Sequence, residues 1–137
     1  MNGVHPRRIP WVQDWSRQVE AKAVAEGFRI ISLAGARNKL KQGGSLFVDA
    51  RPADEFVAGH IAGAESIPFK EFEAHFSTLE NWVVWDKELV IYCSSRDCDD
   101  ALQLALTLRE MGATHLILFI DGFALWEKAG APVEAGK

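Results

Sequence analysis

Two cysteines five positions apart are the residues of this sequence whose type and spacing best suit chemistry. Cys93 follows an apolar run at residues 89–92, and Cys98 immediately precedes a helical pattern that begins near Asp99. A thiolate is a strong nucleophile, and the positive end of a helix favours the thiolate over the thiol. Position alone leaves two alternatives, a reactive nucleophile and a buried inert cysteine.

The residues between the cysteines are small or polar: Ser94, Ser95, Arg96 and Asp97. In an open parallel α/β sheet, ligands bind outside the carboxyl ends of the strands. The backbone N–H groups of a loop at such an end can turn inward and hold an anion. The spacing therefore predicts an anion-binding loop around a nucleophilic Cys93.

Alternating strand and helix patterns surround this loop. Short apolar runs occur at residues 29–33, 46–49, 89–93 and 116–120, and the last three are typical of buried strands. Ser32 can cap a helix over residues 33–41, residues 99–111 form a strong helical pattern, and a turn at 121–122 precedes a short helix. This alternation predicts an α/β fold with a mainly parallel sheet flanked by helices.

Aromatic residues are interpreted as core rather than as ligand-binding surface. Phe69, Phe72 and Phe76 have helical spacing, and Trp82 and Trp85 precede the third strand, where they cover the edge of the core.

Length and composition exclude several classes of protein. The chain has 137 residues, a formal charge of −4 and 48% hydrophobic residues, which fits one globular domain. The acidity argues against a nucleic-acid surface, and no apolar run reaches the roughly 18 residues of a membrane span. Two cysteines are too few for a disulfide scaffold.

The start of the chain has a separate pattern. Trp11, Trp15, Val19 and Ala23 recur every four residues, as on one face of a helix that ends near Gly27. This helix either packs on its own domain or docks on a partner or near a membrane. We therefore divide the chain into an N-terminal extension, residues 1–28, and a domain, residues 29–137.

Two segments beside the cysteine loop extend the interpretation. Residues 49–68, which read DARPADEFVAGHIAGAESIP, closely resemble the first signature of the rhodanese-like family. Residues 121–133, which read DGFALWEKAGAPV, resemble its closing segment, and Cys93 lies where the family keeps its catalytic cysteine. The resemblance implies a three-layer sandwich around a five-stranded sheet, here preceded by an extra helix.

The resemblance also implies a sulfurtransferase of the thiosulfate sulfurtransferase type. Cys93 would take sulfane sulfur from thiosulfate or polysulfide, become a persulfide and pass the sulfur to a thiol acceptor or a partner protein. The terminal sulfur is anionic and needs hydrogen-bond donors. The residues expected to bind substrate are Ser94, Ser95, Arg96, Asp97, Cys98 and Arg51. Arg96 either meets an anionic donor or stays solvated.

The first signature segment is interpreted mostly as scaffold. Arg51 either borders the mouth of the site or pairs with Asp49 or Glu55, and His60 is expected to be a hydrogen-bonded turn residue. The remaining histidines share no metal-ligand spacing with the cysteines, so we expect no metal and no other cofactor.

The loop departs from the family at two points. Cys98 occupies the sixth place, where many relatives keep an arginine, and three acidic residues, Asp97, Asp99 and Asp100, lie at the rim. This acidity weakens the case for dianionic thiosulfate as the donor. Phosphatases of the same fold carry an arginine six places after the cysteine, whereas Asp99 occupies that position here, which argues against phosphatase activity.

Cys98 leaves further alternatives. It is either a packing residue or a thiol that attacks a modified Cys93, which requires the two Cα atoms to approach within about 7 Å. The chain could thus be a redox or sulfur-carrier module, or a rhodanese-like interaction domain without catalysis. A free thiol favours the cytoplasm, and the periplasm stays open if an N-terminal anchor precedes this sequence.

Overall fold

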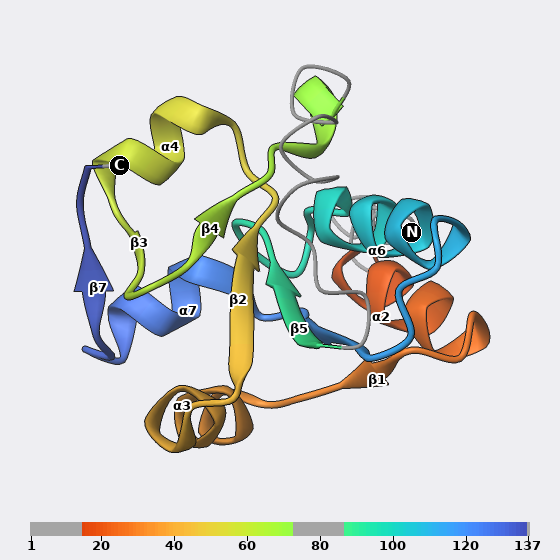
Figure 1. The fold of residues 1–137 in the computed structure, drawn as a ribbon, viewed down its shortest axis with the longest axis horizontal. Coiled ribbons are helices and arrows are strands. Elements are labelled where there is room, and N and C mark those ends of the chain that lie inside the picture. Colours follow the sequence, from red (N-terminus) through yellow and green to blue (C-terminus); the bar gives the residue numbers. More distant parts are fainter. Residues whose placement is uncertain (1–14, 73–86, 137) are drawn as a thin grey trace, which may run out of the picture.

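The computed structural model describes residues 15–72 and 87–136, whose centre is a parallel sheet of five strands (Figure 1). All neighbouring strands in this sheet run parallel, as the sequence predicts. In spatial order the strands are β1 (Arg29–Ile30), β6 (Leu116–Phe119), β5 (Glu88–Tyr92), β2 (Ser45–Asp49) and β4 (Glu65–Ser66).

Helices cover both faces of the sheet (Figure 1). Residues of α2 (Trp15–Ala25) and α6 (Asp100–Glu110) contribute to the core on one face. Residues of α3 (Leu33–Gln42), α4 (Ala53–Ala58) and α7 (Gly122–Lys128) contribute to the core on the other. A short antiparallel pair, β3 (His60–Ile61) and β7 (Val133–Glu134), lies beside the second set. The predicted three-layer α/β architecture is confirmed.

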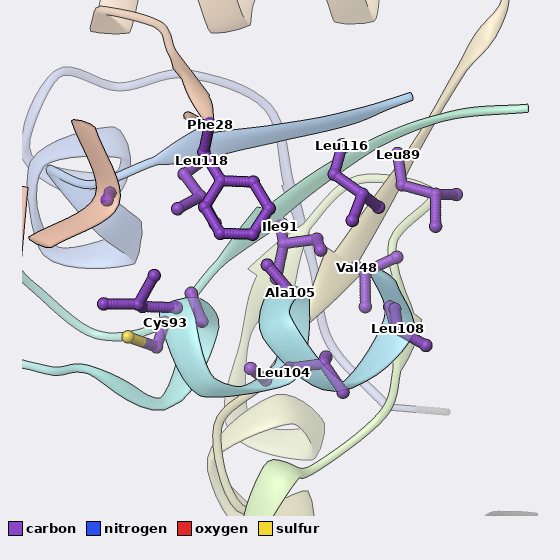
Figure 2. Packing of buried hydrophobic residues seen from close by; sticks show 14 of the residues in the cluster. Phe28, Val48, Leu89, Ile91, Cys93, Leu104, Ala105, Leu108, Leu116 and Leu118 are labelled. Carbon is purple, nitrogen blue, oxygen red and sulfur yellow. The ribbon is translucent and has the colours of Figure 1, made fainter. Parts of the chain in front are cut away.

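Alternation along the strands explains why both faces are apolar. In β5, Leu89 and Ile91 belong to the core beside α6, whereas Val90 and Tyr92 belong to the core beside α7. All four side chains are at most 2% exposed. Figure 2 shows Leu89 and Ile91 in the same cluster as Leu104 and Leu108 of α6. Full burial of such aliphatic side chains contributes about 1.5–3 kcal/mol each, so the strands that carry the cysteine loop are firmly held.

The α2 helix packs on the sheet. Val19 and Ala23 are 4% and 0% exposed and share a core cluster with Phe28. The first of the two alternatives for this segment, packing on its own domain, is therefore the one observed for residues 15–25. Trp11 lies outside the described residues.

Local chemistry sets the start of α3. The Ser32 hydroxyl accepts a hydrogen bond from the Gly35 N–H at 3.1 Å, which satisfies one of the first donors of the helix. The predicted cap is confirmed. Of the apolar run at residues 29–33, only Arg29 and Ile30 form a strand, β1, because this cap begins a helix at Leu33.

Two other predictions need correction or fall outside the description. Of the expected helical stripe, Phe69 lies in a 3-10 turn, η1 (Phe69–Glu71), and Phe72 follows it in helical conformation. Both phenylalanines pack against the α6-side core, as expected. Pro68 precedes η1, and Phe76, Trp82 and Trp85 lie outside the described residues. None of the described helices is both long and apolar enough to span a membrane.

Glu88, at the start of β5, connects this strand to β1, α3 and β2. Its carboxylate accepts from Ser45 and pairs with Lys39 at 2.9 Å and Arg29 at 3.6 Å. The hydrogen bond from Lys39, followed by that from Ser45, holds the pKa of Glu88 below its ordinary value. The native state therefore binds this proton less tightly than the unfolded chain does.

Replacing Glu88 by Gln should lower the free energy of unfolding by about 1 kcal/mol at pH 7. Because the native pKa is lowered, this contribution exists above the unfolded pKa and is lost as the pH falls through the native pKa. Urea denaturation at pH 7 and at pH 3 checks both statements. Glu110→Gln, at an exposed position, is the matched control. A Glu88→Gln effect as large at pH 3 as at pH 7 would contradict the linkage.

Candidate active site

Cys93 is the first residue beyond β5, at the carboxyl edge of the sheet. The strands on both sides of β5, β2 and β6, run parallel to it and end at the same edge. Cys93 itself is 3% exposed and belongs to the α6-side core, as Figure 2 shows. The observed strand stops one residue before the end of the apolar run at residues 89–93, because β5 ends at Tyr92 and Cys93 belongs to the loop.

The α7 helix anchors the first two residues of this loop. The Phe123 N–H donates to the Cys93 carbonyl and the Ala124 N–H donates to the Ser94 carbonyl, both at 2.9 Å. Gly122 makes this approach possible, because an added Cβ would lie 2.6 Å from the Cys93 carbonyl oxygen. Its φ of +74° is also a conformation that side chains disfavour. The turn at 121–122 was predicted, but its role in seating the cysteine loop was not.

The loop leaves backbone donors open. The Cys98 N–H donates to the Ser95 carbonyl at 3.0 Å and closes a turn within the loop. In the part of the chain that the structure describes, the N–H groups of Ser94, Ser95 and Arg96 donate to no backbone carbonyl or side chain. Open donors beside a sulfur atom at a strand end can hold a small anion.

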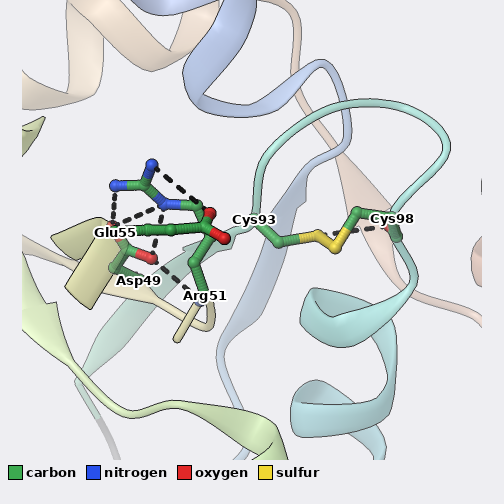
Figure 3. Close-up of a disulfide and its surroundings, with 5 residues drawn as sticks. All are labelled: Asp49, Arg51, Glu55, Cys93 and Cys98. Atoms are coloured by element: carbon green, nitrogen blue, oxygen red, sulfur yellow. Dashed lines mark hydrogen bonds and ion pairs between the residues drawn. A yellow bond between two sulfur atoms is a disulfide. The ribbon is translucent and has the colours of Figure 1, made fainter. Parts of the chain in front are cut away.

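Cys93 and Cys98 are joined by a disulfide (Figure 3). Their Cα atoms are 6.3 Å apart, within the range that such a bond requires. Cys98 is partly exposed, unlike Cys93, and lies directly before the residues that start α6. The Cα separation also meets the distance of about 7 Å within which the two thiols can react with each other.

Arg96 is engaged by two carboxylates. Its guanidinium donates to Asp121 at 2.6 Å and to Glu20 of α2. These bonds raise the pKa of Arg96, and the one to Asp121 is the largest cause. Arg96 is therefore a partly exposed cation that two carboxylates already pair, rather than a cation free to meet a sulfur donor. Sequence reasoning did not identify Glu20, because no local pattern connects two residues 76 positions apart.

Arg51 forms an ion pair with Asp49, which is one of the alternatives that the sequence left open for this side chain. Its guanidinium donates to both carboxylate oxygens of Asp49 (Figure 3). It also donates to the Gly59 carbonyl at 2.6 Å. Glu55 lies 4.0 Å away, and the guanidinium stacks over Phe123 at 4.3 Å. Burial lowers the pKa of Arg51, but the hydrogen bond and charge of Asp49 outweigh it and raise the pKa overall. This side chain links β2 to the residue that anchors Cys93.

Tyr92 completes a buried polar network below the loop. Its hydroxyl donates to Asp49 at 2.7 Å and accepts from the Ile61 N–H at 3.0 Å. Burial, followed by the Asp49 charge, raises the pKa of Tyr92 well above its ordinary value, so it stays a neutral donor. His60, expected in a turn, is the first residue of β3 instead, and its Nδ1 lies 2.7 Å from the Phe56 carbonyl.

The acidic rim has one buried member. Asp97 and Asp99 are exposed, whereas Asp100, the first residue of α6, is 8% exposed. Burial raises the pKa of Asp100, the Lys70 charge opposes this shift, and the Asp99 charge adds to it. Because two carboxylates already pair with Arg96, this side chain offers little uncompensated positive charge to a dianion.

A cysteine at the carboxyl edge of a parallel sheet, in a loop that leads directly into a helix, is the central feature of this three-layer α/β fold. The model of the rhodanese-like domain family matches residues 32–129. The chain belongs to this family.

Individual proteins are also similar to this chain. The chain is 32% identical over 106 residues to the HTH-type transcriptional regulator Rv0324 of Mycobacterium tuberculosis, covering 77% of this chain and 45% of that protein. It resembles the human single-domain sulfurtransferase TSTD1 with a TM-score of 0.63 and 28% identity, covering 74% of this chain and 97% of that one. The chain spans less than two thirds of the length of the curated relatives compared.

A third likeness concerns the fold alone. A thiosulfate sulfurtransferase from Pseudomonas aeruginosa superposes with a TM-score of 0.70 at 18% identity, covering 90% of this chain and 23% of that one. Together the family and these neighbours support a fold of the sulfurtransferase type.

Proposed function

We propose that the protein is a sulfurtransferase that carries sulfane sulfur as a persulfide on Cys93. The observation that carries this proposal is the placement of Cys93 at the carboxyl edge of the sheet, beside loop N–H groups that no backbone carbonyl or side chain among the described residues engages. A persulfide adds a terminal sulfur that is largely anionic, and such donors stabilise it without a general acid.

The chemistry divides into two displacements. With both thiols reduced, the Cys93 thiolate attacks the outer sulfur of thiosulfate, a new S–S bond forms, and sulfite leaves with the electron pair of the broken bond. With a polysulfide, a shortened polysulfide leaves instead. A thiophilic acceptor then attacks the outer sulfur and the Cys93 thiolate leaves. Ser94 and Ser95 contribute N–H groups, and their hydroxyls add two further donors.

The charges around the loop bear on the choice of donor. Asp121 and Glu20 compensate Arg96, and Asp97 and Asp99 lie exposed at the rim. Repulsion of this kind acts most strongly on dianionic thiosulfate. Arg51 acts by holding Asp49 and Phe123 under the loop rather than by touching the donor.

Replacing Cys93 by Ser should abolish sulfur loading. The reduced and desalted protein, incubated with thiosulfate or with polysulfide, is expected to yield a species about 32 Da heavier when Cys98 is replaced by Ser. The Cys93→Ser/Cys98→Ser double variant should stay at its starting mass with both donors. Intact-mass spectrometry after removal of the donor makes the comparison.

Two results would contradict the proposal that Cys93 carries the sulfur. If the variant that retains Cys93 takes up no sulfur from either donor, Cys93 is not a sulfur carrier and the domain acts by binding alone. If both variants gain the same mass, the sulfur is elsewhere on the chain.

A further inference from the structure

The position of Cys98 is fixed by two elements at once. Its N–H donates to the Ser95 carbonyl inside the loop, and α6 begins two residues later, at Asp100. The Asp99 carbonyl already accepts from the Gln103 N–H of this helix. Cys98 therefore sits at the junction of the loop and the helix, not at a free loop tip.

Cys93 is fixed independently at the other end of the loop. The Phe123 N–H holds its carbonyl, and β5 ends immediately before it. The Cα atoms of the two cysteines are 6.3 Å apart with the disulfide formed. Because both backbone positions are tied to regular structure, we expect the two sulfur atoms to remain within reach of each other when reduced.

We propose that Cys98 is a resolving thiol that converts the Cys93 persulfide into a disulfide and releases hydrosulfide. This inference rests on the proposed function, because it starts from the loaded Cys93. The Cys98 thiolate attacks the inner sulfur, which is Sγ of Cys93, and forms the Cys93–Cys98 bond. The bond to the terminal sulfur breaks, and that sulfur leaves with the electron pair as HS⁻.

No external acid or base is needed for this step, because Cys98 supplies the proton that the leaving sulfide carries. The loaded Cys93 is a persulfide anion and Cys98 begins as a thiol, so the Cys98 proton leaves with the terminal sulfur. The sulfane sulfur is reduced to sulfide, and the two cysteine sulfurs are oxidised to the disulfide. One such reaction uses no outside reductant, but the next requires a dithiol that reduces the disulfide and is itself oxidised.

The difference in exposure between the two cysteine residues favours attack of the regenerating dithiol at Cys98. Cys98 is partly exposed, whereas Cys93 is 3% exposed. An incoming dithiol therefore reaches Sγ of Cys98, and Cys93 leaves as a thiolate. The loop N–H groups that favour the persulfide also favour this leaving group, since both are sulfur anions.

The inference narrows the acceptor to a chemical class. A transferase without a resolving thiol passes the outer sulfur to an acceptor that becomes persulfidated. With Cys98 acting, the final product is hydrosulfide and the consumed co-substrate is a dithiol of low molecular weight or on a protein.

A single-turnover experiment tests this assignment. Wild type and Cys98→Ser are reduced, desalted under anaerobic conditions and mixed with thiosulfate, which contains no sulfide. Wild type is expected to release about one sulfide per chain and end about 2 Da lighter than the reduced form. Cys98→Ser should release at least tenfold less sulfide and end about 32 Da heavier. Polysulfide loading followed by desalting repeats the mass readings if thiosulfate loads slowly.

The outcomes separate the two proposals. If wild type and Cys98→Ser both retain the added sulfur equally, Cys98 is a packing residue and the inference fails while the proposed function stands. If Cys98→Ser takes up no sulfur from either donor, the proposed function fails and the inference with it. Disulfide formation in wild type without matching sulfide would overturn the resolving role and leave plain oxidation of the pair.

Discussion

Replacing Asp49 by Ala is expected to lower the free energy of unfolding by about 3–5 kcal/mol. Asp49 is fully buried and is the partner that compensates Arg51, whose side chain is 7% exposed. Removing the carboxylate leaves a buried guanidinium without its counter-charge and a Tyr92 hydroxyl without its acceptor. The free energy of unfolding of a small domain is roughly 5–15 kcal/mol, so this loss is a large share of the total stability.

Urea denaturation followed by tryptophan fluorescence measures this effect. Asp54→Ala, at an exposed position on the first turn of α4, is the matched control and should cost no more than about 1 kcal/mol. Asp49→Asn keeps the shape and the acceptor oxygen, so it should lie between the two. Equal effects of Asp49→Ala and Asp54→Ala would show that the Asp49 network contributes little to stability.

Replacing Gly122 by Ala should displace the cysteine loop and slow sulfur loading at least tenfold. The new Cβ would lie 2.6 Å from the Cys93 carbonyl oxygen and 2.8 Å from the Ser94 carbonyl carbon, and both are backbone atoms that have no free rotation. Relief of the clash must lengthen the hydrogen bonds from Phe123 and Ala124 that anchor the loop. Strain and overpacking together should cost about 2–4 kcal/mol of stability.

Gly130 provides the control for this substitution. It has a φ of +76°, close to that of Gly122, but an added Cβ there meets no atom within 4 Å. Gly130→Ala therefore carries the conformational cost, about 1–2 kcal/mol, without the clash. Rates of persulfide formation by intact-mass spectrometry should fall for Gly122→Ala and not for Gly130→Ala. Equal rates for the two variants would rule out close packing of α7 as the device that seats the loop.

Much of the fold could be predicted from sequence because it depends on local patterns. Apolar runs of strand length identify the three long central strands, and the Ser32 cap and Gly43 delimit α3 within one residue. The short strands β3, β4 and β7 were not predicted, since two residues cannot show a period.

In the candidate site, too, features set by contiguous sequence could be predicted, whereas features set by distant segments could not. The position of Cys93 follows from the strand, the loop and the helix around it, all contiguous in sequence. The partners of Arg96 and the packing of Gly122 against Cys93 depend on contacts between distant segments, and no local pattern encodes them. For Arg51 the sequence named Asp49 and Glu55 as alternative partners, and only the fold shows that Asp49 makes the hydrogen bonds while Glu55 lies 4.0 Å away.

The ion pair between Arg96 and Glu20 has a consequence for the smallest autonomous unit of this chain. Glu20 lies before residues 32–129, which match the family, yet it grips the loop that carries Cys93. Val19 and Ala23 of the same helix line the core beneath that loop. A fragment trimmed to the family boundaries would lose part of its own interior along with a restraint on the loop that carries Cys93. The α2 helix thus braces that loop from outside the residues that match the family.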